Sequence, residues 1–255
     1  MKPRPYVLAE TNWNTVREHA YEVAILPWGA TEAHNYHLPY ATDIIQSEHI
    51  AAESAGRAWE AGARVVALPC IPFGVNTGQL DIRLDINMSP STQFAVLRDI
   101  VQSLARQGIP KLLILNGHGG NDFRQMIREL TVEFARPFVC TVNWYRMLDL
   151  GEYFDEPGDH AGEMETSNMM FIAPDLVLPL EQAGRGTARA FRLQALRDGW
   201  AWAQRTWSSV TDDTGVGNPA LASTGKGQRH LDAVCDRIGS FLVELAEADL
   251  DDLYE

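Results

Sequence analysis

Two carboxylates and a histidine stand close together near the start of the chain. Glu32 and His34 are two residues apart, directly after a short apolar stretch, and Asp43 follows them. Side chains two residues apart on extended backbone point to the same side, so Glu32 and His34 can reach one point. Carboxylate and imidazole groups hold zinc and related divalent cations. The stretch therefore predicts a metal site, with a helix cap as the simpler alternative for Asp43.

Another candidate ligand, His118, lies in the glycine-rich stretch N-G-H-G-G-N at 116–121. Glycines allow the backbone to come close to whatever His118 contacts, and they leave N–H groups free nearby. The alternative is a glycine-rich turn in which the histidine has no function. The position of His118, directly after an apolar strand-like stretch, favours the functional interpretation.

A third stretch combines His160 with two glutamates, Glu163 and Glu165. If Asp159 caps a helix that continues through Phe171, His160 and Glu163 share one face of that helix, whereas Glu165 points away. An acidic first turn that complements the helix dipole would explain one glutamate but not the whole group. We therefore predict that Glu163 accompanies His160.

Short apolar stretches alternate with helical patterns through the first part of the chain. The expected strands are 21–27, 64–69, 111–115 and 138–142, and the expected helices are 11–20, 44–61, 89–107 and 121–136. Such alternation predicts an α/β fold, a mostly parallel sheet with helices on both faces. Ligands bind such sheets at the carboxyl ends of the strands, where Glu32, His34 and His118 fall. Nothing divides the chain, so we expect a single domain over 1–255.

Composition excludes several classes of function. A formal net charge of -13 disfavours nucleic acid and anionic membranes as partners. The three cysteines are far apart and form no CxxC, which is typical of reduced thiols in a cytoplasmic protein. No signal core and no apolar stretch of ~18 residues occurs. The absence of GxGxxG, P-loop and GxSxG motifs disfavours a nucleotide-binding module and a serine hydrolase.

Taken together, the three stretches resemble the motifs of the creatininase (creatinine amidohydrolase) family. They read L-P-W-G-A-T-E-A-H at 26–34 with Asp43, N-G-H-G-G-N at 116–121 and H-A-G-E-M-E-T-S at 160–167, and G-V-G-N-P at 215–219 also fits. The resemblance spans roughly residues 24–245. It implies an α/β/α three-layer sandwich, hydrolysis of a small non-peptide and often cyclic amide, and a homo-oligomer, commonly a hexamer built as a trimer of dimers.

The resemblance also implies a role for each motif residue. Glu32 and His118 would hold one divalent metal ion, His34 would hold a second, and Asp43 would bridge them. His160 matches the histidine that transfers protons beside the metals. Zinc, manganese and iron all accept such a set of nitrogen and oxygen ligands.

Two departures from the family pattern matter. Creatininases carry a metal-binding glutamate where this chain has Gly120, so the second metal needs another carboxylate. The helix-face argument selects Glu163 as this fifth protein ligand, unless it only hydrogen-bonds a ligand. The second departure is Ile82-Arg83-Leu84-Asp85, which replaces a Phe-Pro-Gly-Thr segment that helps to line the site in relatives. We therefore expect poor hydrolysis of creatinine. The preferred substrate should be another amide, with a charged group that Arg83 can bind.

The expected reaction is hydrolysis by a hydroxide that bridges two metals ~3.5–4 Å apart. Backbone N–H groups of Gly119 and Gly120 would stabilise the oxyanion, and His160 would protonate the leaving nitrogen. Family members with the Gly-Gly loop include a formamide hydrolase that acts on a flavin and deazaflavin precursor, and a peptide-maturing peptidase. The alternative from another class is a binding or sensing protein that keeps the fold without catalysis.

Three tryptophans in the C-terminal third, Trp200, Trp202 and Trp207, allow two interpretations. They could form a helix face that packs on the core or on a neighbouring subunit. They could instead form a lid over a planar substrate.

Overall fold

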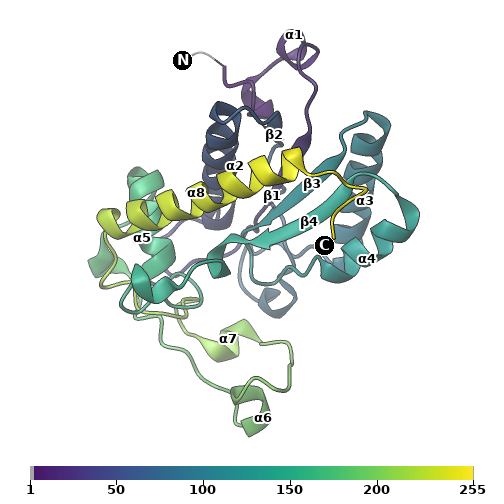
Figure 1. Cartoon of the computed structure of the whole chain (residues 1–255). Coiled ribbons are helices and arrows are strands. Elements are labelled where there is room, and N and C mark those ends of the chain that lie inside the picture. The colour runs from purple at the N-terminus through teal and green to yellow at the C-terminus, as the bar shows by residue number, and fades with distance from the viewer. Residues whose placement is uncertain (1–2, 255) are drawn as a thin grey trace.

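The computed structural model describes residues 3–254, and a sheet of four parallel strands lies at its centre (Figure 1). The strands are β1 (Val23–Trp28), β2 (Val65–Ala67), β3 (Lys111–Asn116) and β4 (Phe138–Asn143), in the order β2-β1-β3-β4. The predicted parallel α/β sheet is confirmed. Strands β1 and β3 pair along their whole length, from Val23 opposite Lys111 to Trp28 opposite Asn116.

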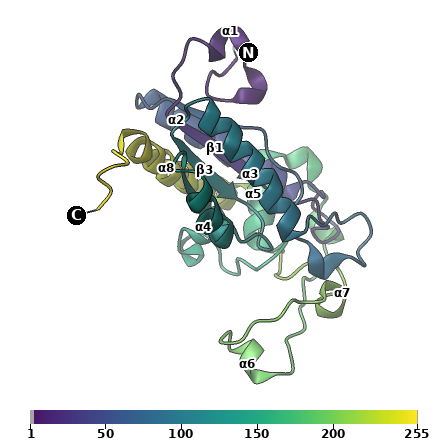
Figure 2. The same cartoon turned by 90° about the vertical axis from the view of Figure 1, so that its right-hand side faces the viewer.

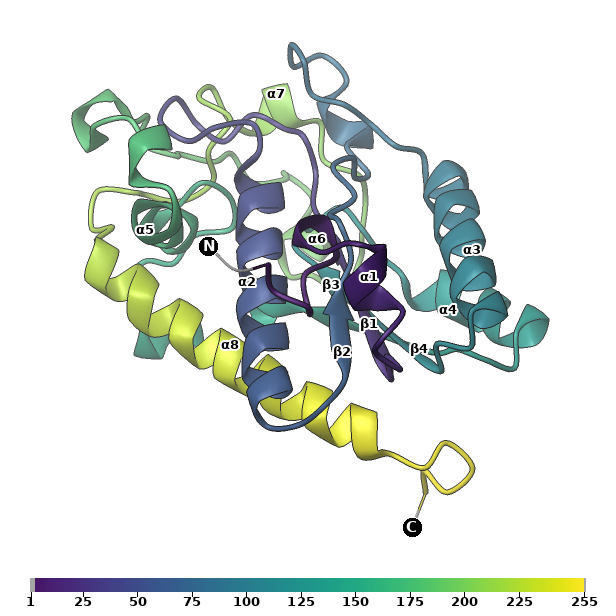
Figure 3. The ribbon, with the colours of Figure 1, turned by 90° about the horizontal axis from the view of Figure 1, so that it is seen from above.

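Helices cover both faces of this sheet, which makes three layers (Figure 3). The larger helices are α2 (Thr42–Glu60), α3 (Pro90–Arg106), α4 (Arg124–Glu133), α5 (Glu163–Ile172) and α8 (Thr224–Glu247). Alternate strand residues point to opposite faces. Thus Val23 and Ile25 pack with α2 and α8, whereas Ala24 and Leu26 pack with α3 and α4.

The strands remain parallel, but the direction in which successive strands are added to the sheet reverses between β1 and β3 (Figure 2). From β1 it passes through α2 to β2 on one side, and then returns through α3 to β3 on the other side of β1. At such a switch point the loops after the two neighbouring strands separate and leave room for a site. Those loops carry Glu32 and His34 after β1, and His118 after β3.

Helix α5 begins later than the sequence suggested. Its first residue is Glu163, and Gly162 is the N-cap residue. His160 lies outside the helix because it forms an antiparallel bridge with Val216, and Ala161 has a φ of 51°. The prediction that Asp159 caps this helix, with His160 and Glu163 on one helical face, is therefore wrong.

Elsewhere the short elements also differ from expectation. Helix α4 begins at Arg124, and of the two expected caps, Asn121 and Asp122, it is Asp122 that accepts the N–H of Arg124, whereas Asn121 binds Asn116 and the N–H of Val75. Trp207 begins α7, but Trp200 and Trp202 lie outside any helix, so the expected helix face formed by the three tryptophans is wrong. The short helices are α1 (Trp13–Val16), α6 (Gln194–Arg197) and α7 (Trp207–Val210), and the 3-10 turns are Leu8–Glu10, Thr77–Gln79, Trp144–Arg146, Leu150–Glu152, Pro174–Leu176 and Leu180–Gln182. Within residues 3–254, every helix is too short or too polar to cross a membrane.

Candidate metal centre

Six side chains that can bind metal converge at the switch point. They are Glu32, His34, Asp43, His118, His160 and Glu165. Their ligand atoms form three overlapping groups, within each of which all atoms lie within 4.8 Å of one another. All except the partly buried Glu165 are buried. The structure thus brings together five of the six predicted site side chains, and adds Glu165.

Asp43 lies at the centre of the cluster, in the first turn of α2. Its Oδ1 is 3.2 Å from Nε2 of His34, and its Oδ2 is 3.1 Å from Nδ1 of His118. The start of α2 can approach the end of β1 because residue 29 is glycine: a Cβ there would lie 2.9 Å from the backbone nitrogen of Ile44. The N-cap residue of α2 is Ala41. The two oxygens of Asp43 therefore face two different histidines, and Asp43 is not the N-cap residue of α2.

Each of the three histidines is held by a backbone carbonyl on its outer side. His34 Nδ1 lies 3.1 Å from the Glu32 oxygen, His118 Nε2 lies 3.1 Å from the Val75 oxygen, and His160 Nε2 lies 2.9 Å from the Ala33 oxygen. An imidazole that donates one N–H in this way presents the lone pair of its other nitrogen inward. Three rings fixed in this manner around carboxylates fit a metal site rather than a solvated loop.

Glu32 is held by the cluster on one side and by an amide on the other. Its Oε1 is 3.0 Å from Nδ1 of His118 and 3.8 Å from Nδ1 of His160. Its Oε2 accepts a 2.5 Å hydrogen bond from Nε2 of Gln79, in the turn Thr77–Gln79. Gln79 was not predicted, because no motif marks a glutamine in an irregular loop.

Helix α5 presents Glu165 to the cluster and turns Glu163 away. Oε1 of Glu165 is 4.0 Å from Nε2 of His34, while its Oε2 accepts a 2.5 Å hydrogen bond from the N–H of Ala161. Glu163 is fully buried, but it pairs with Lys226 and accepts the N–H of Glu156. The prediction that Glu163 rather than Glu165 faces the cluster is therefore wrong, because the helix begins at Glu163.

Burial and mutual attraction shift the pKa values of the clustered groups. Burial opposes the charged form of His34, but the hydrogen bond and charge of Asp43 outweigh it and raise the pKa of His34 to about 10. The pKa of His118 is raised well above its usual value by Glu32 and Asp43, against the same burial. Burial raises the pKa of Glu165. Bound cations would replace these imidazole protons, because ligating nitrogen must be neutral.

Two further segments wall the cluster. Asp85 accepts a 2.7 Å hydrogen bond from the N–H of Ala33, and burial raises the pKa of Asp85 to about 6. On another side the ring of Trp207 packs edge-on against His160, with centroids 5.3 Å apart, and the guanidinium of Arg205 lies 4.5 Å from the Trp207 centroid. Of the three predicted tryptophans, only Trp207 reaches the site.

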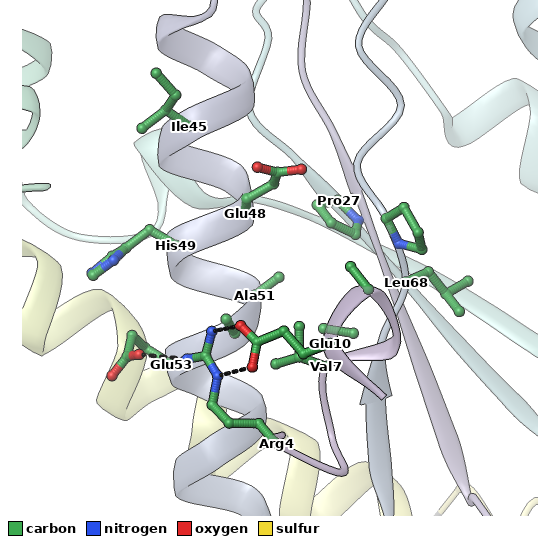
Figure 4. A pocket seen from close by; sticks show the side chains of 14 residues that line it. Arg4, Val7, Glu10, Pro27, Ile45, Glu48, His49, Ala51, Glu53 and Leu68 are labelled. Carbon is green, nitrogen blue, oxygen red and sulfur yellow. Dashed lines mark hydrogen bonds and ion pairs between the residues drawn. The ribbon is translucent and has the colours of Figure 1, made fainter. Parts of the chain in front are cut away.

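The hollow in Figure 4 is separate from this cluster. It has a volume of about 330 Å³ and lies between the N-terminal segment and α2. Arg4 and Glu10 form a 2.5 Å ion pair across it, and His49 projects from α2 into its wall. None of the six clustered side chains lines it, so it offers no second access to the cluster.

Residues 9–242 match the family model of the creatininases, described as creatinine amidohydrolase. A mycofactocin precursor peptide peptidase from Mycobacterium ulcerans (strain Agy99) is 27% identical over 213 residues, which are 80% of this chain and 78% of that protein.

Solved structures of the same kind are also similar. A proposed creatinine amidohydrolase from Bacteroides fragilis NCTC 9343 has a TM-score of 0.93 and 42% identity, and the match covers 98% of this chain and 99% of that one. A structure described as "Creatininase Mn" has a TM-score of 0.80 at 19% identity, and covers 95% of this chain and 99% of its own. The latter similarity concerns the fold alone.

Proposed function

The chain belongs to the creatininase family, whose members are metal-dependent amidohydrolases, and we propose that it hydrolyses a small non-peptide amide or formamide at a centre for two divalent cations. The observation that carries this proposal is the position of Asp43, whose two oxygens face different histidines at 3.2 and 3.1 Å. A carboxylate with one oxygen toward each of two ligand sets is what a bridging ligand requires.

Five of the six side chains form two sets of three protein ligands that share Asp43, and His160 belongs to neither set. Glu32, Asp43 and His118 would hold one cation, and His34, Asp43 and Glu165 the other. Three protein ligands are typical of a catalytic site that keeps a position open. Three carboxylates also offset three of the four positive charges of two divalent cations, which makes their burial tolerable. Zinc, manganese and iron all suit these ligands.

When bound, the cations would supply an acidified water and polarise the amide carbonyl. The protein's own contribution begins with His160. Because Nε2 of His160 donates to the Ala33 carbonyl, Nδ1 is the atom that faces the cluster and can carry a proton to the leaving nitrogen. Trp207 packs edge-on against this ring, and His160 is buried.

Two backbone amides beside His118 are placed to receive negative charge. Within the described residues, neither the N–H of Gly119 nor that of Gly120 donates a hydrogen bond, and both residues are exposed. Free N–H groups next to a ligand are the donors that stabilise an oxyanion on the carbonyl carbon. We assign the developing oxyanion to this pair.

The loop around Asp85 supports a substrate other than creatinine. Asp85 supports the peptide between the ligands Glu32 and His34 through its bond to Ala33, while the side chain of Arg83 is exposed. An exposed guanidinium in the same loop as Asp85 suits an amide that carries an anionic group. A second candidate is a peptide-maturing peptidase, which the 27% identity to the mycofactocin precursor peptide peptidase favours.

Activity measurements on the metal-loaded protein would test the proposal. The panel comprises creatinine, formamides, other cyclic amides, lactones and short peptides, each with wild type, His160→Gln and a control, His49→Gln. We expect turnover of a non-creatinine amide that falls about 10²–10⁴-fold in His160→Gln with unchanged metal content, and is normal in His49→Gln. Loss of a metal ion in His160→Gln would instead make His160 a ligand, and a metal-loaded protein inactive on the whole panel would contradict the proposal.

A further inference from the structure

Asn121, in the loop between β3 and α4, is a buried amide whose side chain joins three segments of the chain. It is 6% exposed. Its Oδ1 accepts hydrogen bonds from the N–H of Val75 at 3.0 Å and from Nε2 of Gln93 at 2.8 Å, and its Nδ2 donates to Oδ1 of Asn116 at 3.0 Å. Val75 lies in the irregular loop after β2, Gln93 is in α3, and Asn116 ends β3. A buried amide bonded in this way fixes the relative positions of the segments that it joins.

The bond to Val75 leads to the ring of His118. The carbonyl of Val75 accepts the Nε2–H of His118 at 3.1 Å, so Asn121 holds by its N–H the same residue that orients the imidazole. A proton on Nε2 leaves the lone pair on Nδ1, and Nδ1 faces the carboxylates of Glu32 and Asp43 at 3.0 and 3.1 Å. Asn121 therefore helps to decide, through Val75, which ring nitrogen is free to bind a metal ion.

The bond to Asn116 leads to the main chain of the same histidine. Oδ1 of Asn116 accepts the N–H of His118 at 3.1 Å, and Nδ2 of Asn116 donates to the His118 carbonyl at 3.0 Å. Only one orientation of this amide satisfies both groups, and the donation from Asn121 to the same Oδ1 stabilises it. The backbone N–H of Asn121 also donates to the His118 carbonyl, at 3.2 Å. The position of the His118 main chain therefore depends on Asn121 as well.

Two backbone segments bound the imidazole of His118 closely. A Cβ at Gly74 would lie 2.7 Å from Cδ2 of His118, and a Cβ at Gly120 would lie 2.5 Å from its Nε2. Because backbone rather than flexible side chains limits the ring, the angle of the ring follows the separation of these two segments. They are the segments that Asn121 joins, since it lies directly after Gly120 and binds the N–H of Val75, directly after Gly74.

We propose that Asn121 is the positioning residue of the metal ligand His118. Its amide sets the angle of the imidazole through Val75 and the place of the main chain through Asn116, and thereby raises the affinity of the centre for its cations. The role rests on the proposed function, because the position of His118 matters to affinity only if a cation binds there. Groups that orient a ligand from outside typically contribute about 10–100-fold to metal affinity.

Gln93 provides a matched control, because it shares the network but not the contacts with the histidine. It is a fully buried amide, and within residues 3–254 its side chain hydrogen-bonds only Oδ1 of Asn121. Gln93→Met therefore removes one hydrogen bond of Asn121 and leaves those to Val75 and Asn116. If the network only stabilises the fold, Gln93→Met and Asn121→Ala should affect metal binding alike. If Asn121 positions His118, only Asn121→Ala should weaken it.

Two measurements on the full-length proteins, neither of which needs a substrate, test this role. Zinc titration of the metal-free proteins against a chromophoric chelator measures affinity, and the visible bands of the cobalt(II)-loaded proteins report the arrangement of the ligands. We expect Asn121→Ala to bind at least one zinc ion about 10–100-fold more weakly than wild type and to shift the cobalt bands. Gln93→Met should lower the free energy of unfolding but keep the affinity and the bands. Equal loss of affinity in both variants, or no loss in Asn121→Ala, would overturn the proposal.

A second variant decides the question if Asn121→Ala does not fold. Asn121→Asp keeps the size of the side chain and the acceptor for Val75, but it places an acceptor opposite Oδ1 of Asn116. By its charge alone a carboxylate in this loop would strengthen the binding of cations. Weaker zinc binding in Asn121→Asp is therefore the expected sign of a displaced His118, and binding equal to or tighter than wild type would overturn the proposal. A wild type that takes up no zinc would contradict the proposed metal centre itself, whereas normal uptake with unaffected variants contradicts only the role of Asn121.

Discussion

The carboxylate of Glu163 and the ammonium of Lys226 form an ion pair that joins the first turn of α5 to the first turn of α8. Glu163 is fully buried, and Lys226 also binds Asp155 at 2.7 Å. The pair sets the position of α5 from the side opposite the cluster. As a consequence, Glu165 reaches His34 from the same helical turn.

Exchange of either glutamate for glutamine should therefore have different effects. Glu165→Gln should lose one metal ion per chain by elemental analysis, with a large loss of activity, because one of the two sites falls to two protein ligands. Glu163→Gln should keep both ions but lower the free energy of unfolding by about 1 kcal/mol, since Lys226 loses its buried partner and keeps Asp155. The reverse pattern of metal loss would contradict the assignment.

The reason that the sequence misplaced these glutamates is physical. The candidate ligands after β1 and β3 follow apolar strands directly, so the strand-end rule sufficed to locate Glu32, His34 and His118. The start of α5 depends instead on the pairing of His160 with Val216, which is 56 residues distant and leaves no local signal. The prediction of which glutamate shares a helix face with His160 failed because it placed the start of α5 before Glu163.

The walls of the site were less predictable than its ligands. Gln79 and Asp85 act from an irregular loop, where no periodic pattern indicates the direction of a side chain. The tryptophans gave a compositional signal, but Gly199, with a φ of 76°, separates Trp200 from α6 and breaks the expected helix. Only Trp207 returns to the site, which the spacing alone does not reveal.

Asp43 should be indispensable for both metal ions. Its two oxygens face His34 and His118, so Asp43→Ala removes a ligand from each set at once. We expect metal content close to zero after exposure to a mild chelator, with near-native circular dichroism. Asp43→Asn, which keeps the shape, should behave alike if charge is what matters. The exposed Asp122→Ala is the control, and retention of two ions in Asp43→Ala would contradict the bridging role.

Neighbouring glycines in the β3 loop should respond very differently to alanine. A Cβ at Gly120 would lie 2.1 Å from the Val75 oxygen and 2.5 Å from Nε2 of His118, which are the two atoms of the bond that orients His118. A Cβ at Gly119 meets nothing within 4 Å. Loss of such an outer hydrogen bond typically weakens metal binding about 10–100-fold.

Titration of the metal-free proteins with zinc would measure this difference. Gly120→Ala should bind at least one ion more weakly, whereas Gly119→Ala should match wild type. Gly120→Glu, with the residue that creatininases carry there, should fail to restore metal in Glu165→Gln, since the same Cβ has no room. Restoration by Gly120→Glu would show that the loop can open, and would argue against the tight packing described here.

Acid should destabilise the protein through His230, which is not among the six clustered side chains. His230 is fully buried, its Nδ1 lies 3.1 Å from Asn168 Oδ1, and its Nε2 has no partner among the described residues. Burial lowers its pKa to about 4. In the unfolded chain the pKa is about 6.5, so between pH 6.5 and 4 the unfolded state binds more protons and stability falls as the pH falls.

The effect of His230 on the free energy of unfolding depends on the difference between its pKa values in the folded and the unfolded chain. Over the 1.5 pH units from about 6.5 to 5 the loss is about 2 kcal/mol at ~1.4 kcal/mol per unit. Urea unfolding of wild type and His230→Gln at pH 7 and pH 5 isolates it, because every other titration is common to both proteins. The decrease in unfolding free energy between the two pH values should be about 2 kcal/mol smaller in His230→Gln. Equal decreases in the two proteins would mean that His230 takes up its proton without unfolding.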